Sequence, residues 1–295
     1  MGKQGTSASL PRRQMGRYLR ESREEQNLTQ GQVATIMDWS VSTQSRLERG
    51  DVGRLRARDI ELLCQNLGLD HEKSAAMVGL FKQGAEKSWW HSFGDLIPET
   101  FNVYIGLEAS ARQIEIFRPD IIPGLLQTND YAATLDRIYF PKDSEEERRR
   151  RIELKTKRQA IITRKANPAT IDVILGEAVL HAVVGNPKIM SAQHRHLAEL
   201  STCPNVTIRV LPFGAGFPVG GPVGPFSILD YGLDAAGGVA EPTVVYVEGF
   251  TGAMYFEGES DLRRYREALT IIRHTALDAV ASRRLLRQRM KEYLA

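Results

Sequence analysis

Apolar residues in the first part of the chain recur every three or four positions, the spacing that turns one face of a helix toward a core. The pattern predicts helices over 15–25, 30–37, 41–49 and 56–66, and it continues to about residue 84. Small, polar and basic residues before them predict a disordered arm over 1–14. The sequence therefore predicts a bundle of four to five helices over 15–84.

Residues at the helix boundaries fix the second and third of these helices. Thr29 and Ser40 stand directly before them, where a side-chain oxygen accepts a hydrogen bond from a first-turn N–H. Gly50 directly follows the third helix, in the position that favours a left-handed residue. The small side chain of Ala34 lets the second and third helices approach closely. Two short capped helices joined by a tight turn are predicted.

Residues 85–295 have a mixed pattern that predicts an α+β domain. Ser144 and Glu147 form a capping box for a long charged helix over 144–165, and further helices are predicted over 188–200 and 259–293. Proline and glycine predict a loop over 212–225. Short β-branched or aromatic runs predict strands over 170–175, 206–211, 226–229, 243–247 and 253–256. The predicted fold class is mainly α with a mixed α+β C-terminal domain.

Composition and charge place the chain among two-domain globular proteins with one basic end. The 295 residues are 42% hydrophobic and 25% charged, and no apolar run approaches the ~20 residues of a membrane helix. Cys64 and Cys203 are far apart, so reduced thiols and a cytoplasmic location are expected. Residues 1–60 carry eleven Lys and Arg against seven Asp and Glu, whereas the whole chain has a net charge of +3. A basic N-terminal module suits phosphate binding.

The third predicted helix has the features of a helix that reads DNA. A helix fits the major groove and presents its first turn to the base edges, so Val41 and Ser42 lie foremost and Arg46 follows one turn later. Gln30 begins the second helix, where its side chain and backbone N–H can reach a phosphate. The candidate DNA-binding residues are Gln30, Ser40, Val41, Ser42, Thr43, Ser45, Arg46, Arg49, Arg12, Arg13 and Arg17. Arg54 and Arg56 are further candidates for phosphate contacts. The alternative is a small helical bundle whose turn only resembles a DNA-binding motif.

The segment LTQGQVATIMDWSVSTQSRLERG (28–50) resembles the Cro/phage-repressor (xenobiotic response element) helix-turn-helix. The resemblance implies that the first residues of the third helix read bases. Two positions depart from the family pattern: Gln44 replaces a buried aliphatic residue, and Asp38 replaces a glycine. The residues that carry the resemblance are Thr29, Gln30, Ala34, Ser40, Leu47, Glu48 and Gly50.

The remainder resembles the C-terminal domain of actinobacterial, antitoxin-like helix-turn-helix regulators of the WhiJ-like type. The resemblance implies a regulator that is often paired with a small partner protein encoded nearby. Roles in development and specialised metabolism are typical of that family. The matching stretches include WWHSFGDLIPETFNVYIGLEASA (89–111), IIPGLLQTNDYAATL (121–135), IMSAQHRHLAELSTCPNVTIRVLPF (189–213) and VVYVEG (244–249).

Acids and aromatic residues in this domain form the candidates for a ligand or partner site. Glu108, Glu177 and Glu248 stand among apolar neighbours, where an acid needs a cationic partner; Arg112 and Arg158 are candidates. The alternatives are structural ion pairs or helix caps. Trp89 and Trp90 either line a pocket or belong to the core.

No enzyme, cofactor or metal site is expected. His194 and His196 lie two residues apart and point in different directions on a helix, and no nucleophile-elbow, zinc-protease or phosphate-loop motif is present.

These observations predict a homodimeric transcription regulator that binds double-stranded DNA, with a C-terminal domain that senses a small partner protein or a ligand. The dimer surface is expected in the C-terminal domain or in its long helices. The alternative function is an antitoxin-like factor that sequesters a small partner, with DNA binding as autoregulation. A ligand-sensing repressor and an enzyme fused to a DNA-binding domain are the other classes considered.

Overall fold

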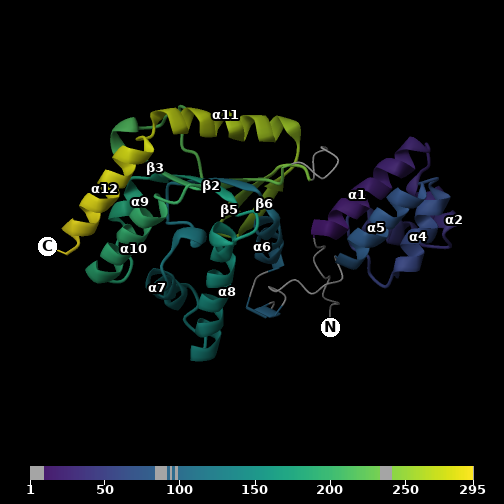
Figure 1. The fold of residues 1–295 in the computed structure, drawn as a ribbon, viewed down its shortest axis with the longest axis horizontal. Coiled ribbons are helices and arrows are strands. Elements are labelled where there is room, and N and C mark those ends of the chain that lie inside the picture. The colour runs from purple at the N-terminus through teal and green to yellow at the C-terminus, as the bar shows by residue number, and fades with distance from the viewer. Residues whose placement is uncertain (1–9, 84–91, 94, 97–98, 233–240, 295) are drawn as a thin grey trace. The chain divides into compact units, whose positions relative to one another are not determined.

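The computed structural model describes residues 10–83, 92–93, 95–96, 99–232 and 241–294 (Figure 1). The chain forms two compact units, residues 1–107 and residues 108–295, and the division falls within helix α6 (Glu99–Ser110). The expected boundary between residues 84 and 85 lies outside the described residues. None of the described helices is long and apolar enough to span a membrane.

The N-terminal unit is a helical bundle around one core. Its helices are α1 (Leu10–Glu25), α2 (Gln30–Ile36), α3 (Val41–Glu48), α4 (Ala57–Asn66) and α5 (His71–Gln83). The four helices predicted up to residue 66 are confirmed, and so is the helical pattern that follows them. The core that joins them includes Met15, Leu19, Val33, Leu47, Ile60 and Leu63.

Helix α1 begins at Leu10 rather than at Met15, so residues 10–14 of the expected disordered arm are helical. Pro11 is compatible with this start, because the first turn of a helix leaves its N–H groups unbonded. The guanidinium of Arg12 lies 5.9 Å from the ring centroid of Phe81 in α5. Packing against α5 therefore orders the segment, which the local composition alone did not indicate.

The C-terminal unit is built on a six-stranded mixed sheet with the order β3-β2-β1-β4-β5-β6. The first three strands are mutually parallel, and the last three are antiparallel to their neighbours. The strands are β1 (Gln113–Arg118), β2 (Thr170–Gly176), β3 (Val206–Leu211), β4 (Phe226–Asp230), β5 (Val244–Gly249) and β6 (Gly252–Phe256). All five predicted strands are confirmed, and β1 is the strand that the sequence analysis missed.

Helices lie on both sides of this sheet, with α11 along one side and α7 and α8 on the other (Figure 1). The helices are α7 (Asn129–Tyr139), α8 (Glu145–Thr163), α9 (Ala178–His181), α10 (Pro187–Leu200), α11 (Glu259–Thr275) and α12 (Ala279–Glu292). Leu269 and Ile272 of α11 pack on Phe117, Ile174 and Phe226 of the sheet. The predicted fold class, an N-terminal helical bundle followed by a mixed α+β domain, is therefore confirmed.

The single helix predicted over 259–293 is two helices, and the break has a tertiary cause. The backbone N–H of Leu277 donates to the carbonyl of Val210 at the end of β3 (2.9 Å). Asp278 then caps α12 by accepting a hydrogen bond from the N–H of Ala281 (2.7 Å). The contact with β3 thus takes the chain out of helical geometry before α12 begins.

Candidate nucleic-acid interface

The N-terminus of α3 is capped as the sequence predicts. Ser40 has an extended backbone, and its Oγ accepts a hydrogen bond from the N–H of Thr43 (3.2 Å). The hydroxyl groups of Ser42 and Thr43 each lie 2.9 Å from Ser40 Oγ. Thr29 caps α2 in the same way and forms a capping box with Gln32. Because its start is fixed by side chains, α3 presents a defined first turn.

Left-handed residues end α2 and α3 at their expected places. Asp38, which replaces the usual glycine, has φ +56°, and Gly50 has φ +84°. After α3, the N–H groups of Gly50 and Asp51 donate to the carbonyls of Leu47 (2.8 Å) and Arg46 (2.9 Å). This paired pattern satisfies the last carbonyls of a helix. An aspartate tolerates the left-handed region better than most residues, so the turn keeps its geometry without glycine.

One side of α3 is exposed and carries the predicted base-reading residues. Val41 is 53% exposed, and Ser42, Arg46 and Arg49 are also exposed, whereas Ser45 is half-buried. The opposite side of the helix, Gln44, Leu47 and Glu48, is buried. The helix therefore separates its polar contact face from its packing face.

Glu48 is the centre of a buried polar network that fixes the orientation of α3. Arg23 of α1 donates to both carboxylate oxygens, from Nε (2.6 Å) and from Nη2 (3.0 Å). Gln44 donates to Oε1 (2.8 Å), and Gln30 of α2 donates to Oε2 (2.7 Å). The side chains of Arg23 and Glu48 are 9% and 3% exposed. Three helices thus meet at one carboxylate, and Gln44 has a polar partner where the family places an aliphatic residue.

The charges in this network reinforce each other. Burial raises the pKa of Glu48, but the hydrogen bonds from Arg23, Gln44 and Gln30 and the charge of Arg23 outweigh it, and the pKa lies below its ordinary value. The hydrogen bond to Glu48 raises the pKa of Arg23. Both groups are therefore ionised in the folded protein at neutral pH.

Gly16 is a structural position that the sequence analysis did not identify. A Cβ atom at this position of α1 would lie 2.5 Å from the carbonyl oxygen of Leu47 and 2.8 Å from that of Glu48. These carbonyls belong to the last turn of α3, so α1 crosses that end in direct backbone contact. A glycine inside a helical pattern was the available signal, although residue 16 lay in the first turn of the helix predicted over 15–25.

The other predicted contact residues lie in different surroundings. Gln30 begins α2, but its side chain is bound to Glu48. Burial lowers the pKa of Arg12, whose guanidinium lies over Phe81. Arg13 and Arg17 are half-buried on α1. Arg46 of α3 and Arg49, which directly follows that helix, are exposed and available to a nucleic acid, and all these contacts stay predictions.

The three acids proposed for a ligand or partner site each have a separate partner within the C-terminal unit. Buried Glu108 accepts two hydrogen bonds from Arg158 (2.7 and 2.9 Å). Glu177 accepts from the backbone N–H of Phe213 (2.7 Å) and precedes α9. Glu248 is exposed and pairs with Arg118 (2.9 Å). The described contacts therefore do not bring them into one site, and Trp89 and Trp90 lie outside the described residues.

Side-chain amides hold the segment that follows β1, a role that the sequence analysis did not foresee. Gln127 donates to the carbonyl of Ile122 (2.7 Å), and its Oε1 accepts from Lys155 of α8 (2.8 Å). Gln193 of α10 accepts from the N–H of Thr128 (2.6 Å) and donates to the carbonyl of Leu126 (2.7 Å). These contacts position the short 3₁₀ helix at 124–126 (η2) between α8 and α10. Burial lowers the pKa of Lys155 to about 8.

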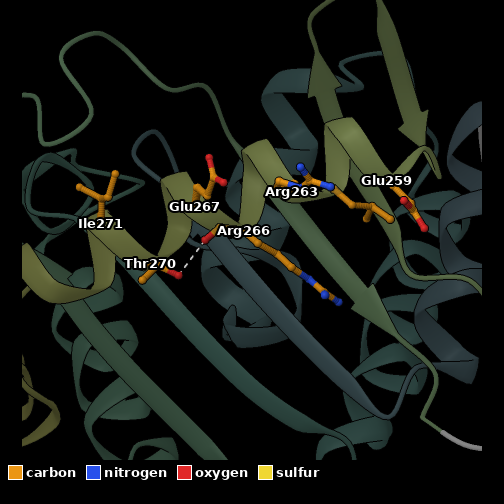
Figure 2. A pocket seen from close by; sticks show the side chains of 7 residues that line it. Glu259, Arg263, Arg266, Glu267, Thr270 and Ile271 are labelled. Carbon is orange, nitrogen blue, oxygen red and sulfur yellow. Dashed lines mark hydrogen bonds between the residues drawn. The ribbon is translucent and has the colours of Figure 1, made fainter.

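Two hollows follow the exposed sides of helices in this unit. One, of about 690 Å³, lies along α11 and is lined by side chains of that helix (Figure 2). Two acids and two arginines are among its lining residues, and Nη2 of Arg266 lies 3.6 Å from Oδ2 of Asp230. The other, of about 570 Å³, runs along α12. Among the described residues, no group of three or more His, Cys, Asp or Glu is arranged to hold a metal ion.

Comparison with known proteins agrees with this division of the chain. A family model described as a helix-turn-helix domain matches residues 14–77. Such a domain is a DNA-binding module, so the match supports a DNA-binding regulator. A second model, described as a domain of unknown function (DUF5753), matches residues 101–288. No curated protein and no solved structure matches the chain. Because the second match covers more than half of the 295 residues, the chain belongs to the DUF5753 family and carries a helix-turn-helix domain before it.

Proposed function

We propose that the chain is a sequence-specific transcription regulator that inserts α3 into the major groove of duplex DNA. The observation that carries this proposal is the exposed side of α3, whose start is capped by Ser40 and whose buried side is anchored through Glu48. Arg46 is suited to bidentate contact with a guanine, and Val41 to contact with a thymine methyl group. Arg49 is suited to a phosphate.

The regulator acts as a homodimer in this proposal, on a nearly palindromic operator with half-sites ~34 Å apart or a multiple of that distance. One small helical domain makes few phosphate contacts, and linking two domains raises the affinity through effective concentration. The C-terminal unit receives the regulatory input from a partner protein or a ligand. The assignment to the WhiJ-like, antitoxin-like type belongs to this proposal as well.

Selection of bound sequences from random duplexes, followed by titration of the selected operator, tests the proposal. Arg46→Ala should cost about 1–3 kcal/mol of binding free energy and relax specificity at one base position. Arg263→Ala removes an exposed cation from α11 and is the matched control; it should leave the operator affinity unchanged. If the full chain prefers no duplex sequence over any other, the proposal is wrong. An equal loss for Arg46→Ala on all sequences would reassign Arg46 to a phosphate.

A further inference from the structure

Helix α12 has one side packed on its own unit and one side exposed. Ser282 and Leu286 are buried, and the helix packs against α10 and β3, at the end of the chain (Figure 1). Ser191 Oγ of α10 donates to the carbonyl of Met290 (3.0 Å), and Ser282 Oγ accepts from the N–H of Val210 in β3 (3.0 Å). The helix is thus held firmly, and its outer side is a rigid surface.

The outer side carries a row of side chains with a regular 4-3-4-3 spacing. The row consists of Val280, Arg284, Arg287 and Lys291 of α12 and of Leu294 in the turn that follows the helix, and we call it the α12 seam. All five are exposed; the apolar residues at its two ends, Val280 and Leu294, are 73% and 67% exposed. The hollow of about 570 Å³ follows the same side of the helix. Residues at this spacing lie above one another on one side of a helix, so one partner could contact all of them.

The three cations of the α12 seam are not neutralised by the one acid, Glu292, that lines the hollow with them. Among the described residues, none of Arg284, Arg287 and Lys291 takes part in an ion pair or a side-chain hydrogen bond. The nearby acid Glu292 is already bound by Arg289 and by Gln288. Cations three or four residues apart on one side of a helix repel one another and destabilise it. Carboxylates of a partner would offset this repulsion and would also attract the cations directly.

We propose that the α12 seam docks an acidic amphipathic helix of a partner protein, with apolar side chains over Val280 and Leu294 and carboxylates between them. The inference rests on the proposed function, in which the C-terminal unit receives the regulatory input, and it specifies the chemistry of the partner. Three cations between two apolar residues match such a helix in charge and in the order of charged and apolar positions. A DNA backbone offers phosphates for the cations but nothing apolar for the two ends.

A synthetic helical peptide is the probe for this surface. The peptide carries three glutamates between two leucines at 4-3-4-3 spacing, and its binding to the full chain is followed by fluorescence anisotropy. Arg284→Glu with Arg287→Glu should weaken binding at least tenfold. The matched control, Arg263→Glu with Arg264→Glu on the exposed side of α11, makes the same change in net charge and should bind the peptide about as the parent chain does. A peptide with lysines in place of the glutamates should bind the Arg284/Arg287 variant better than it binds the parent.

The outcomes separate the proposal from its alternatives. Equal binding of a scrambled peptide of the same composition, or an equal loss in the control variant, would overturn it by showing attraction to net charge alone. A fall in affinity for unrelated duplex DNA without a change in peptide binding would reassign the seam to DNA. The operator titration is carried out on the same variants: peptide binding that fails while operator binding persists refutes this inference and leaves the proposed function intact. Unchanged circular dichroism and melting of both variants exclude misfolding as the cause.

Discussion

Removal of the charge at Glu48 is the most informative perturbation of the DNA-binding unit. Glu48→Gln keeps the size of the side chain and an oxygen acceptor, but it leaves the nearly buried guanidinium of Arg23 with only the exposed carboxylate of Glu24 as a counter-charge. Loss of one member of a buried, hydrogen-bonded ion pair costs about 3–5 kcal/mol. The amide can still accept one hydrogen bond, so we expect a loss near the lower limit, about 3 kcal/mol.

This loss is a substantial fraction of the free energy of unfolding of a small domain, which is about 5–15 kcal/mol. Urea titration followed by hydrogen exchange of peptides covering residues 28–50 measures the N-terminal unit separately from the C-terminal one. Glu24→Gln is the matched control, because Glu24 is exposed and also contacts Arg23 (3.2 Å); we expect no measurable change. Arg23→Met combined with Glu48→Gln should be less destabilising than the sum of the single changes, because no uncompensated charge remains.

The same reasoning predicts a dependence on pH. The folded state holds the pKa of Glu48 below its ordinary value, so the ionised carboxylate adds stability that is present above the unfolded-state pKa of about 4.3. That contribution is lost as the pH falls through the folded-state pKa, and the difference between parent and Glu48→Gln should shrink there. A loss below about 1 kcal/mol at neutral pH, or a difference that grows in acid, would refute the role assigned to the network.

Three further predictions address other parts of the molecule. Gly16→Ala should destabilise the N-terminal unit by about 1–3 kcal/mol, because its Cβ would meet backbone atoms of α3. Gly31→Ala in α2 should not, because its Cβ would make only an ordinary van der Waals contact with Thr29 Oγ1 (3.8 Å); equal effects in urea titration would contradict the close approach. Arg49→Ala should weaken binding to all duplexes alike and reduce the log–log salt slope by about 0.9, and an unchanged slope would mean that Arg49 contacts no phosphate. Burial lowers the pKa of Lys155 to about 8, below its unfolded value, so the stability of the C-terminal unit should rise between about pH 8 and 10 through this group. Lys155→Met should lack that rise in urea titrations across this range, and an identical pH profile would show that the amine is not buried.

The sequence was sufficient wherever a local rule determined the structure. The caps at Thr29 and Ser40, the left-handed terminator Gly50 and the capping box of α8 are all at their predicted positions. Each depends on hydrogen bonds or backbone angles within a few residues, which composition and spacing encode directly.

Contacts between distant residues could not be predicted in this way. The alternation of Ile114 and Ile116 was visible in the sequence, but the place of β1 between β2 and β4 depends on pairing with residues far along the chain. The break between α11 and α12 depends on a hydrogen bond to β3, and the helical start at Leu10 depends on packing against α5. In each case a tertiary contact overrode the local pattern.

In the candidate DNA-binding site, too, some features were predictable from the sequence and others depend on tertiary contacts. The sequence determined which residues α3 presents, because helix period and capping separate Val41, Ser42 and Arg46 from the buried side. Only the tertiary structure decided what holds that helix: Glu48 collects hydrogen bonds from three helices, and Gly16 admits a backbone contact that any side chain would block. Local propensity depends on neighbours in the chain, whereas burial and ion pairing depend on which segments meet in space.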